Sequence, residues 1–398
     1  MYLITNIKGL VQVREQIREP LRGHEMSVLP VLENAWLLTE ANRIAAYGPM
    51  STCPKGISEQ RTTDASGRFV FPSFVDAHTH IVFAGSRETE FTDRILGLSY
   101  EEMARKGGGI LNSARLLQQT SEDDLYKQSM PRVREVIAAG TGSIEIKSGY
   151  GLTLPDELKI LRVAKRIAQS TNLFVRTTFL GAHAIPSEYT NREDYINLVC
   201  DEMIPAVAAE KLADYCDVFC DRGFFTPEET DLILKAGLKH GLQPKVHANE
   251  LALSGGVQVA VSNRARSADH LEHMGEEEIN LLQNSRTIPV LLPGTAFFLK
   301  IGYPDARRMI AAHLPVALSS DYNPGTCPSG NMSMVLSLAC TQLRMTPEEA
   351  INAATINSAF AMDAIEHTGS VTVGKRANLF ITKPMPSYAY LPYSFGSN

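Results

Sequence analysis

The stretch Phe69-Val70-Phe71-Pro72-Ser73-Phe74-Val75-Asp76-Ala77-His78-Thr79-His80 joins an apolar run to two histidines separated by one residue. The run has the character of a buried strand. Side chains at positions i and i+2 of a strand point to the same side, so His78 and His80 should project together from its end. Such a pair can hold one metal ion, but chance spacing explains it equally well. Other parts of the chain must therefore supply further ligands.

From Gly67 onward, short apolar runs alternate with amphipathic segments, which is typical of parallel strands joined by right-handed helical crossovers. Eight such units favour a closed (β/α)8 TIM-like barrel over an open doubly wound sheet. No G-x-G-x-x-G motif follows the first strand, which argues against a dinucleotide-binding fold. The strands are expected in the run from Phe69 and at 142–147, 173–181, 214–220, 244–248, 265–270, 287–292 and 316–321. Helix patterns between them include 100–138, 155–170, 191–210 and 227–240.

Both ends of the chain have a sequence pattern typical of short strands and turns. The N-terminal strands are expected at 3–7, 27–32, 35–39 and 43–47, and those of the tail at 370–373 and 377–382. The simplest architecture is α/β, with a small flanking β domain built from both chain ends. We therefore expect residues 1–64 and 362–398 to form this domain and residues 65–361 to form the barrel.

The bulk composition limits the classes of partner. The chain has 398 residues, a net charge of −6 and a pI near 6.0, so no electrostatic case exists for binding nucleic acid or an anionic membrane. The sequence shows no signal-peptide pattern and no apolar run long enough to span a bilayer. Its six cysteines lack C-x-x-C spacing, which favours reduced thiols and a cytoplasmic location.

Polar residues gather where the predicted barrel strands end, which is where active sites of such barrels lie. A single buried histidine is more often a hydrogen-bonded core residue than a ligand, but five of the ten histidines at strand ends are hard to attribute to packing. The residues concerned are His78, His80, His183, His247 and His270, with Asp321 after the eighth strand and Glu250 three residues beyond His247.

Three imidazoles and one carboxylate suit a Zn²⁺ or iron centre that keeps one position open for water. We predict His78, His80, His247 and Asp321 as the ligands. Such a metal lowers the pKa of water from 15.7 to roughly 7. Asp321 can then accept a proton, Glu250 can pass it on, and His270 can polarise a substrate carbonyl or hold the water.

Each of these residues also has a structural interpretation. Glu250 could cap the following helix, and Asp321 could begin a plain turn, because Asp, Asn, Pro and Gly in residues 321–325 all favour turns. Lys147 is better explained as a salt-bridge partner than as a catalytic group. Arg87, in the loop after the first strand, could be a solvated surface charge.

The motifs together resemble the amidohydrolase superfamily of metal-dependent hydrolases and, within it, the imidazolonepropionase family. The resemblance covers about residues 65 to 361, and several of its motifs are long. They are His78-x-His80, Phe83-Ala84-Gly85-Ser86-Arg87, Glu145-Ile146-Lys147-Ser148-Gly149-Tyr150-Gly151-Leu152, Gly181-Ala182-His183, His247-Ala248-Asn249-Glu250 and Asp321-Tyr322-Asn323-Pro324-Gly325-Thr326.

The resemblance implies hydrolysis of 4-imidazolone-5-propanoate to N-formimidoyl-L-glutamate, a step of histidine degradation, in a homodimer. Metal-bound hydroxide would attack the ring carbonyl, and the cyclic amide C–N bond would break. One Zn²⁺ or Fe³⁺ per subunit would lie on His78, His80, His247 and Asp321. The substrate-binding residues would be Arg87, Tyr150, His183, Glu250, Asn323, Gly325 and Thr326.

The fourth strand limits the number of metal ions. Binuclear relatives carry a carboxylated lysine there, whereas this strand ends in Cys220-Asp221, so the resemblance implies one ion. Two alternatives remain open on the sequence. One is a related deaminase or cyclic-amide hydrolase acting on a neutral or purine ring, and the other is a barrel that binds without catalysis.

Overall fold

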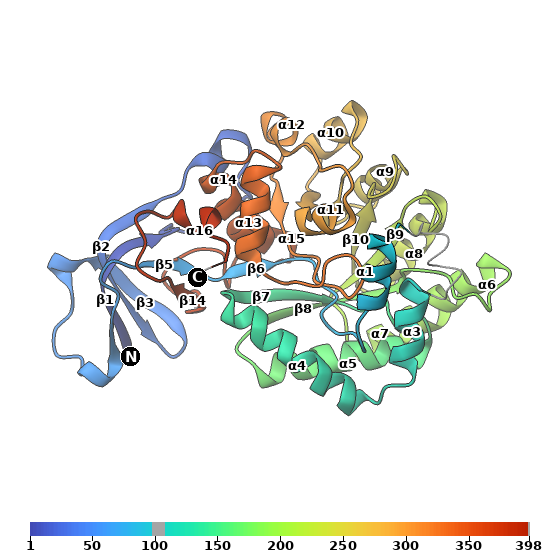
Figure 1. Cartoon of the computed structure of the whole chain (residues 1–398), viewed down its shortest axis with the longest axis horizontal. Helices are drawn as coiled ribbons and strands as arrows, with labels where there is room; N and C mark the ends of the chain where they lie inside the picture. The colour runs from blue at the N-terminus through green and yellow to red at the C-terminus, as the bar shows by residue number, and fades with distance from the viewer. Residues whose placement is uncertain (98–107, 397–398) are drawn as a thin grey trace.

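The computed structural model describes residues 1–97 and 108–396, which form two sheets side by side (Figure 1). The larger sheet has eight strands that follow one another in chain order, and all of their pairings are parallel. Its strands are β6 (Phe74–Asp76), β7 (Thr141–Lys147), β8 (Phe174–Ala182), β9 (Tyr215–Cys220), β10 (Gln243–Ala248), β11 (Ser267–His270), β12 (Ile288–Leu291) and β13 (Ala317–Leu318). This confirms the predicted barrel with a small flanking β domain.

Helices surround the barrel strands, as Figure 1 shows. They are α1 (Glu88–Ile95), α3 (Ile110–Gln118), α4 (Glu122–Ala138), α5 (Leu154–Ser170), α6 (Arg192–Asn197), α7 (Ile204–Ala209), α8 (Pro227–Lys239), α9 (Gly256–Ser262), α10 (Glu276–Gln283), α11 (Pro293–Leu299), α12 (Ala306–Ala311), α13 (Met332–Thr341), α14 (Pro347–Asn352), α15 (Ser358–Ala361) and α16 (Tyr390–Tyr393). The predicted helix at 100–138 corresponds to α3 and α4, and its residues 100–107 lie outside the described residues. None of the helices in the described ranges is long and apolar enough to cross a membrane.

Local sequence explains where these helices begin. Thr226 and Glu229 form reciprocal hydrogen bonds at the start of α8, with Pro227 in its first turn. The predicted helix at 191–210 is α6 and α7 joined by a π-helical segment, Leu198–Met203. Pro205 follows that segment and has no N–H to donate, which interrupts the regular hydrogen-bond pattern.

The smaller sheet contains strands from both chain ends, in the order β14-β5-β1-β2-β3 with β4 beside β1. Its strands are β1 (Tyr2–Val11), β2 (Val31–Glu40), β3 (Arg43–Pro49), β4 (Thr62–Asp64), β5 (Phe69–Pro72) and β14 (Leu379–Ile381). The strand expected at 27–32 is wrong over residues 27–30, because β2 begins at Val31. The strand expected at 370–373 forms only one bridge, between Val371 and Val13.

The apolar run that opens the barrel sequence is two strands rather than one. Residues 69–72 form β5, which pairs with β1 and β14 of the small sheet, and residues 74–76 form β6 of the barrel. Between them, the Ser73 N–H donates to Asn378 O at 2.9 Å. Every residue of both strands is buried, so the sequence has no alternation that could reveal the change of sheet. We propose a division into residues 1–64, 65–361 and 362–398. In this division β5 lies within the barrel segment 65–361 but pairs with strands of the small sheet.

The first and last barrel strands meet just beyond their ends. Asp321 N–H donates to His78 O at 3.1 Å, and His80 N–H donates to Tyr322 O at 2.9 Å. This seam lies at the residues that the sequence predicts as metal ligands. The same backbone contacts that join the two ends of the barrel therefore bring those side chains together.

Candidate active site

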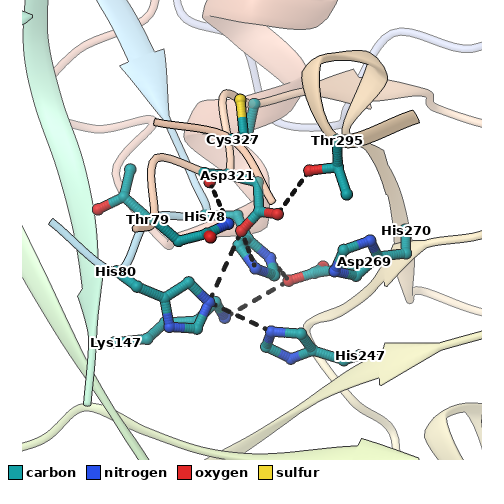
Figure 2. A network of polar contacts seen from close by, with 12 residues as sticks. His78, Thr79, His80, Lys147, His247, Asp269, His270, Thr295, Asp321 and Cys327 are labelled. Carbon is teal, nitrogen blue, oxygen red and sulfur yellow. Dashed lines mark hydrogen bonds and ion pairs between the residues drawn. The ribbon is translucent and has the colours of Figure 1, made fainter. Parts of the chain in front are cut away.

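Three imidazole rings, two after β6 and one from β10, converge with one carboxylate at the carboxyl ends of the barrel strands (Figure 2). Asp321 Oδ1 lies 3.5 Å from His78 Nε2 and 3.7 Å from His80 Nε2. His247 Nε2 lies 3.4 Å from His80 Nε2. All four side chains are buried. The structure thus brings the four predicted ligands into one cluster.

This cluster fits a metal ion. The ligand atoms of His78, His80 and Asp321 all lie within 4.8 Å of one another, and so do those of His78, His247 and His270. His78 Nε2 is buried and has no hydrogen-bond partner among the described residues. Imidazole nitrogens that face one another around a carboxylate are the donor set that Zn²⁺ and iron prefer.

The outer nitrogen of each proposed histidine ligand faces an oxygen. His78 Nδ1 lies 2.7 Å from Asp269 Oδ2, and His247 Nδ1 lies 3.0 Å from Asp217 Oδ2. His80 Nδ1 is 3.4 Å from Ser148 O. An acceptor at Nδ1, as Asp269 provides for His78, favours the tautomer that carries its proton there, which leaves the Nε2 lone pair for a metal. For His247 the contact with Asp217 is an ion-pair distance without hydrogen-bond geometry.

Burial keeps the rings of His78 and His80 neutral. It lowers the pKa of His78 well below its ordinary value, with a further contribution from the Lys147 ammonium. Burial likewise lowers the pKa of His80, and neighbouring His183 adds to the effect. A neutral imidazole is the form that binds a metal.

Asp321 is held in a backbone conformation that few residues adopt. Its φ is +56°, in the left-handed region, which an Asp side chain tolerates better than most. Its Oδ2 accepts a hydrogen bond from Thr295 Oγ1 at 2.6 Å, which leaves Oδ1 facing the imidazoles. Burial raises the pKa of Asp321 to about 6, although the Thr295 hydrogen bond and His247 oppose this.

A pocket of about 700 Å³ of empty space, including its open mouth, lies over the cluster. Ten of the residues singled out in the sequence line it: His80, Arg87, Tyr150, His183, His247, Glu250, His270, Asp321, Asn323 and Thr326. His78 lies beneath these residues, and Gly325 packs against Arg87. The pocket therefore joins the candidate metal site to the predicted substrate-binding residues.

Arg87 is not a solvated surface charge, since its side chain is only 8% exposed. Its Nη2 and Nε lie 2.6 and 2.9 Å from Glu90 Oε2. A Cβ at Gly325 would stand 2.0 Å from Arg87 Nη1, so the guanidinium fits there only because position 325 has no side chain. These contacts hold the cation at the pocket wall.

The loop that carries Tyr150 is held by one buried carboxylate. Glu157 accepts hydrogen bonds from the N–H groups of Gly149, Gly151 and Leu152 at 2.9, 2.7 and 2.8 Å. His183 Nδ1 lies 2.9 Å from Gly149 O, so the same loop also orients the imidazole of His183. Burial, followed by His247, lowers the pKa of His183 to about 3, which keeps this ring neutral.

Glu250 lies in the loop before α9, and the residue that precedes this helix is Gly255, so the helix-cap interpretation of Glu250 is wrong. Glu250 Oε2 stands 3.7 Å from His270 Nε2. Burial raises the pKa of Glu250 to about 8, with additional repulsion from Asp321 and Asp221. In the ion-free site this carboxyl therefore carries a proton at neutral pH.

The turn interpretation of the segment after β13 is correct but incomplete. Asn323 Oδ1 accepts hydrogen bonds from the N–H groups of Gly325 and Thr326 at 2.8 and 2.7 Å, as in a turn. The same segment places Asp321, Asn323 and Thr326 in the pocket wall.

Sequence reasoning missed Asp217, Asp269 and Thr295, which contact the proposed ligands from behind. The salt-bridge interpretation of Lys147 is confirmed, since its Nζ lies 2.7 Å from both Glu145 and Asp217. A usable signal existed in the sequence. Charged residues two apart within buried strands, such as Glu145 and Lys147, must share the barrel interior and must therefore be paired there.

Comparison with known proteins identifies the class. The profile of the Amidohydrolase family matches residues 69–396, and the chain belongs to this family. Among solved structures, E. coli guanine deaminase superposes with a TM-score of 0.72 at 14% identity, covering 100% of this chain and 95% of that one. A 5-methylcytosine deaminase from Klebsiella pneumoniae gives a TM-score of 0.72 at 16% identity, covering 98% and 94%. At these identities the likeness concerns the fold alone.

Relatives with higher sequence identity show which group of amidohydrolases the chain belongs to. The chain is 55% identical to the imidazolonepropionase of Christiangramia forsetii, and the alignment covers 100% of this chain and 96% of that one. It is 54% identical to the imidazolonepropionase of Flavobacterium psychrophilum, with the same coverage. Within the amidohydrolases, the chain therefore falls among the imidazolonepropionases.

Proposed function

We propose that this chain hydrolyses 4-imidazolone-5-propanoate to N-formimidoyl-L-glutamate in histidine degradation, by opening the cyclic amide C–N bond. The observation that carries the proposal is a buried Arg87 in the same pocket as the imidazole and carboxylate cluster. A guanidinium can bind a carboxylate through parallel hydrogen bonds, and the propanoate would give Arg87 an anionic partner in addition to Glu90, which a neutral ring substrate would not. The names of the most similar relatives agree with this choice.

His78, His80, His247 and Asp321 would hold one Zn²⁺ or Fe³⁺. When bound, the ion supplies a Lewis acid and lowers the pKa of water at the site. A single ion is proposed because β9 ends in Cys220 and is followed by Asp221, so that strand offers no lysine to bridge a second one.

The pocket residues would bind the substrate and transfer protons. Arg87 would hold the propanoate, while Tyr150 and His183 would orient the ring, with Asn323, Gly325 and Thr326 completing the wall. Asp321 would accept a proton from the attacking water, and Glu250 would deliver one to the ring nitrogen as the C–N bond opens. His270, close to Glu250, would polarise the ring carbonyl.

The direct test supplies 4-imidazolone-5-propanoate and follows loss of the imidazolone absorbance. Metal-replete protein is expected to turn the substrate over, chelator to abolish turnover, and Zn²⁺ or iron to restore it. Elemental analysis of the purified protein would identify the metal. Absence of turnover by metal-replete protein would contradict the proposal.

The remaining proposals rest on the family and the composition. We propose a homodimer in the cytoplasm. Light scattering after size-exclusion chromatography tests the dimer, since a monomer mass at micromolar concentration would contradict it. Fractionation of the source cells tests the location.

A further inference from the structure

A layer of buried charges lies beneath the metal-facing rings, where branched apolar side chains usually fill such a barrel. Five ionisable side chains, all fully buried, form this layer: Glu145, Lys147, Asp217, Lys245 and Asp269. They come from four of the eight barrel strands, β7, β9, β10 and β11. Buried charges are tolerated only where they are paired, so the contacts within this layer have to be specific.

Lys147 is the centre of the layer. Its Nζ lies 2.7 Å from Asp217 Oδ2 and 3.4 Å from Asp269 Oδ2. These are the same two oxygens that face the imidazoles: Asp217 Oδ2 toward His247 and Asp269 Oδ2 toward His78. Figure 2 shows dashed lines that join Asp269 to both Lys147 and His78. One ammonium thus holds two carboxylates, and each carboxylate holds one proposed metal ligand.

We propose that Lys147 is a positioning residue that determines metal affinity by holding Asp217 and Asp269 in the orientation that His247 and His78 require. If the Lys147 ammonium is removed, Asp217 Oδ2 and Asp269 Oδ2 both lose the cation that fixes their positions. The two imidazoles then lose the acceptor that sets their tautomer and ring angle. The proposal depends on the ligand set given above but not on the identity of the substrate.

Lys245 offers a matched control within the same layer. It is also fully buried, and its Nζ contacts Glu145 and donates a hydrogen bond to Ala77 O at 3.1 Å. In the described part of the chain, no ion pair within 4.0 Å joins Lys245 to Asp217 or Asp269, although the Lys245 charge also stabilises the Asp269 carboxylate from a greater distance. Lys147→Met and Lys245→Met therefore remove the same buried charge, but only the first removes the contacts to both aspartates.

The test measures Zn²⁺ affinity of metal-free variants by competition with a chromogenic chelator, together with their denaturant unfolding. Lys147→Met is expected to raise the Kd for Zn²⁺ on the order of 10- to 100-fold, the usual effect of losing an outer partner of a ligand. Lys245→Met should stay much closer to wild type, even if both variants lose similar stability. The visible spectrum of bound Co²⁺ should change in Lys147→Met and remain as in wild type in Lys245→Met. Equal losses of affinity in the two variants, or no loss in Lys147→Met, would overturn the proposal.

Asp217→Asn and Asp269→Asn keep the test decisive if Lys147→Met does not fold. Each cuts one of the two connections while conserving the shape of the side chain, and each should raise the Kd for Zn²⁺ by about 10-fold or more. Wild-type affinity in both would refute the positioning role. Substrate turnover by the wild-type protein tests the proposed function separately, so failure of one idea is distinguishable from failure of the other.

Discussion

The floor and the mouth of the pocket are held in place by different kinds of contact. In the floor, the imidazoles of His78 and His247 rest on Asp269 and Asp217, which belong to other strands, and on Lys147 beneath them. In the mouth, Arg87 and the loop that carries Tyr150 are held by residues close to them in sequence. Arg87 pairs with Glu90 three positions on, and Glu157 holds the loop of residues 149–152.

Because of this difference, the floor and the mouth should respond differently to mutation. The floor exists only once the barrel strands have assembled, and breaking one of its buried ion pairs leaves an uncompensated charge, at a cost of about 3 to 5 kcal/mol. The contacts of the mouth form within short loops and can be changed one at a time. Mutations in the floor should therefore affect metal binding and stability together, whereas mutations in the mouth should affect substrate binding.

The largest effect is expected from Asp321→Asn in the floor. The amide cannot accept a proton from water as the carboxylate can, so kcat should fall about 1,000-fold or more. Steady-state kinetics with parallel metal analysis checks this. Thr295→Val, which removes only the hydrogen bond to Asp321 Oδ2, should cost about 10-fold, since a hydrogen bond to a charged group contributes roughly 1.5 kcal/mol. Comparable losses in the two variants would argue against Asp321 as the proton acceptor.

Arg87→Met should give the largest effect in the mouth. Loss of the proposed ion pair with the propanoate is expected to lower kcat/KM by about 100- to 1,000-fold, roughly 3 to 4 kcal/mol, with metal content unchanged. An imidazolone that lacks the propanoate supplies the control, because the variant and the wild type should process it at similar rates. A similar drop on both substrates would mean that Arg87 acts structurally.

Gly325→Ala should disturb the mouth more mildly. The new methyl would collide with Arg87 Nη1, so the guanidinium must shift, and KM is expected to rise about 10-fold while metal affinity stays constant. Gly302→Ala is the matched control, since a Cβ there meets no atom within 4 Å. An unchanged KM in Gly325→Ala would show that the guanidinium position is not critical.

The last prediction concerns the pH dependence of stability in the metal-free protein. The pKa of Glu250 is about 8 in the folded chain and near 4.5 when unfolded, so the folded state binds the extra proton between these values. The stability that Glu250 contributes is therefore fully present below about pH 4.5 and declines as pH rises toward 8, by up to about 1.4 kcal/mol per pH unit. Denaturant unfolding at pH 6, 7 and 8 measures the slope, which Glu250→Gln should reduce. If the stability of Glu250→Gln shows the same pH dependence as the wild type, that dependence comes from other carboxyl groups.

The same contrast explains what could be predicted from the sequence. The residues of the mouth follow one another in short motifs such as 323–326, so their roles could be inferred from local order. The eight barrel strands were recognisable from their alternation with helices. The roles of Asp217 and Asp269 were not, because both depend on strand neighbours that only the assembled barrel defines. The change of sheet at Ser73 also escaped prediction, since an apolar run buried on all sides has no period to interpret.

The seam between the first and last barrel strands gives the metal a second role. His78 and His80 stand on one side of this seam and Asp321 on the other, so an ion bound to all three acts as a cross-link between the two ends of the barrel. Such a link favours the folded chain by RT ln(1 + [M]/Kd), or about 4 kcal/mol when the free ion exceeds its Kd 1,000-fold. Loss of the ion should then loosen the barrel first at this seam, where faster exchange of the His80 and Asp321 amide hydrogens would report it. In such a chain, supply of the metal controls the lifetime of the folded enzyme as well as its chemistry.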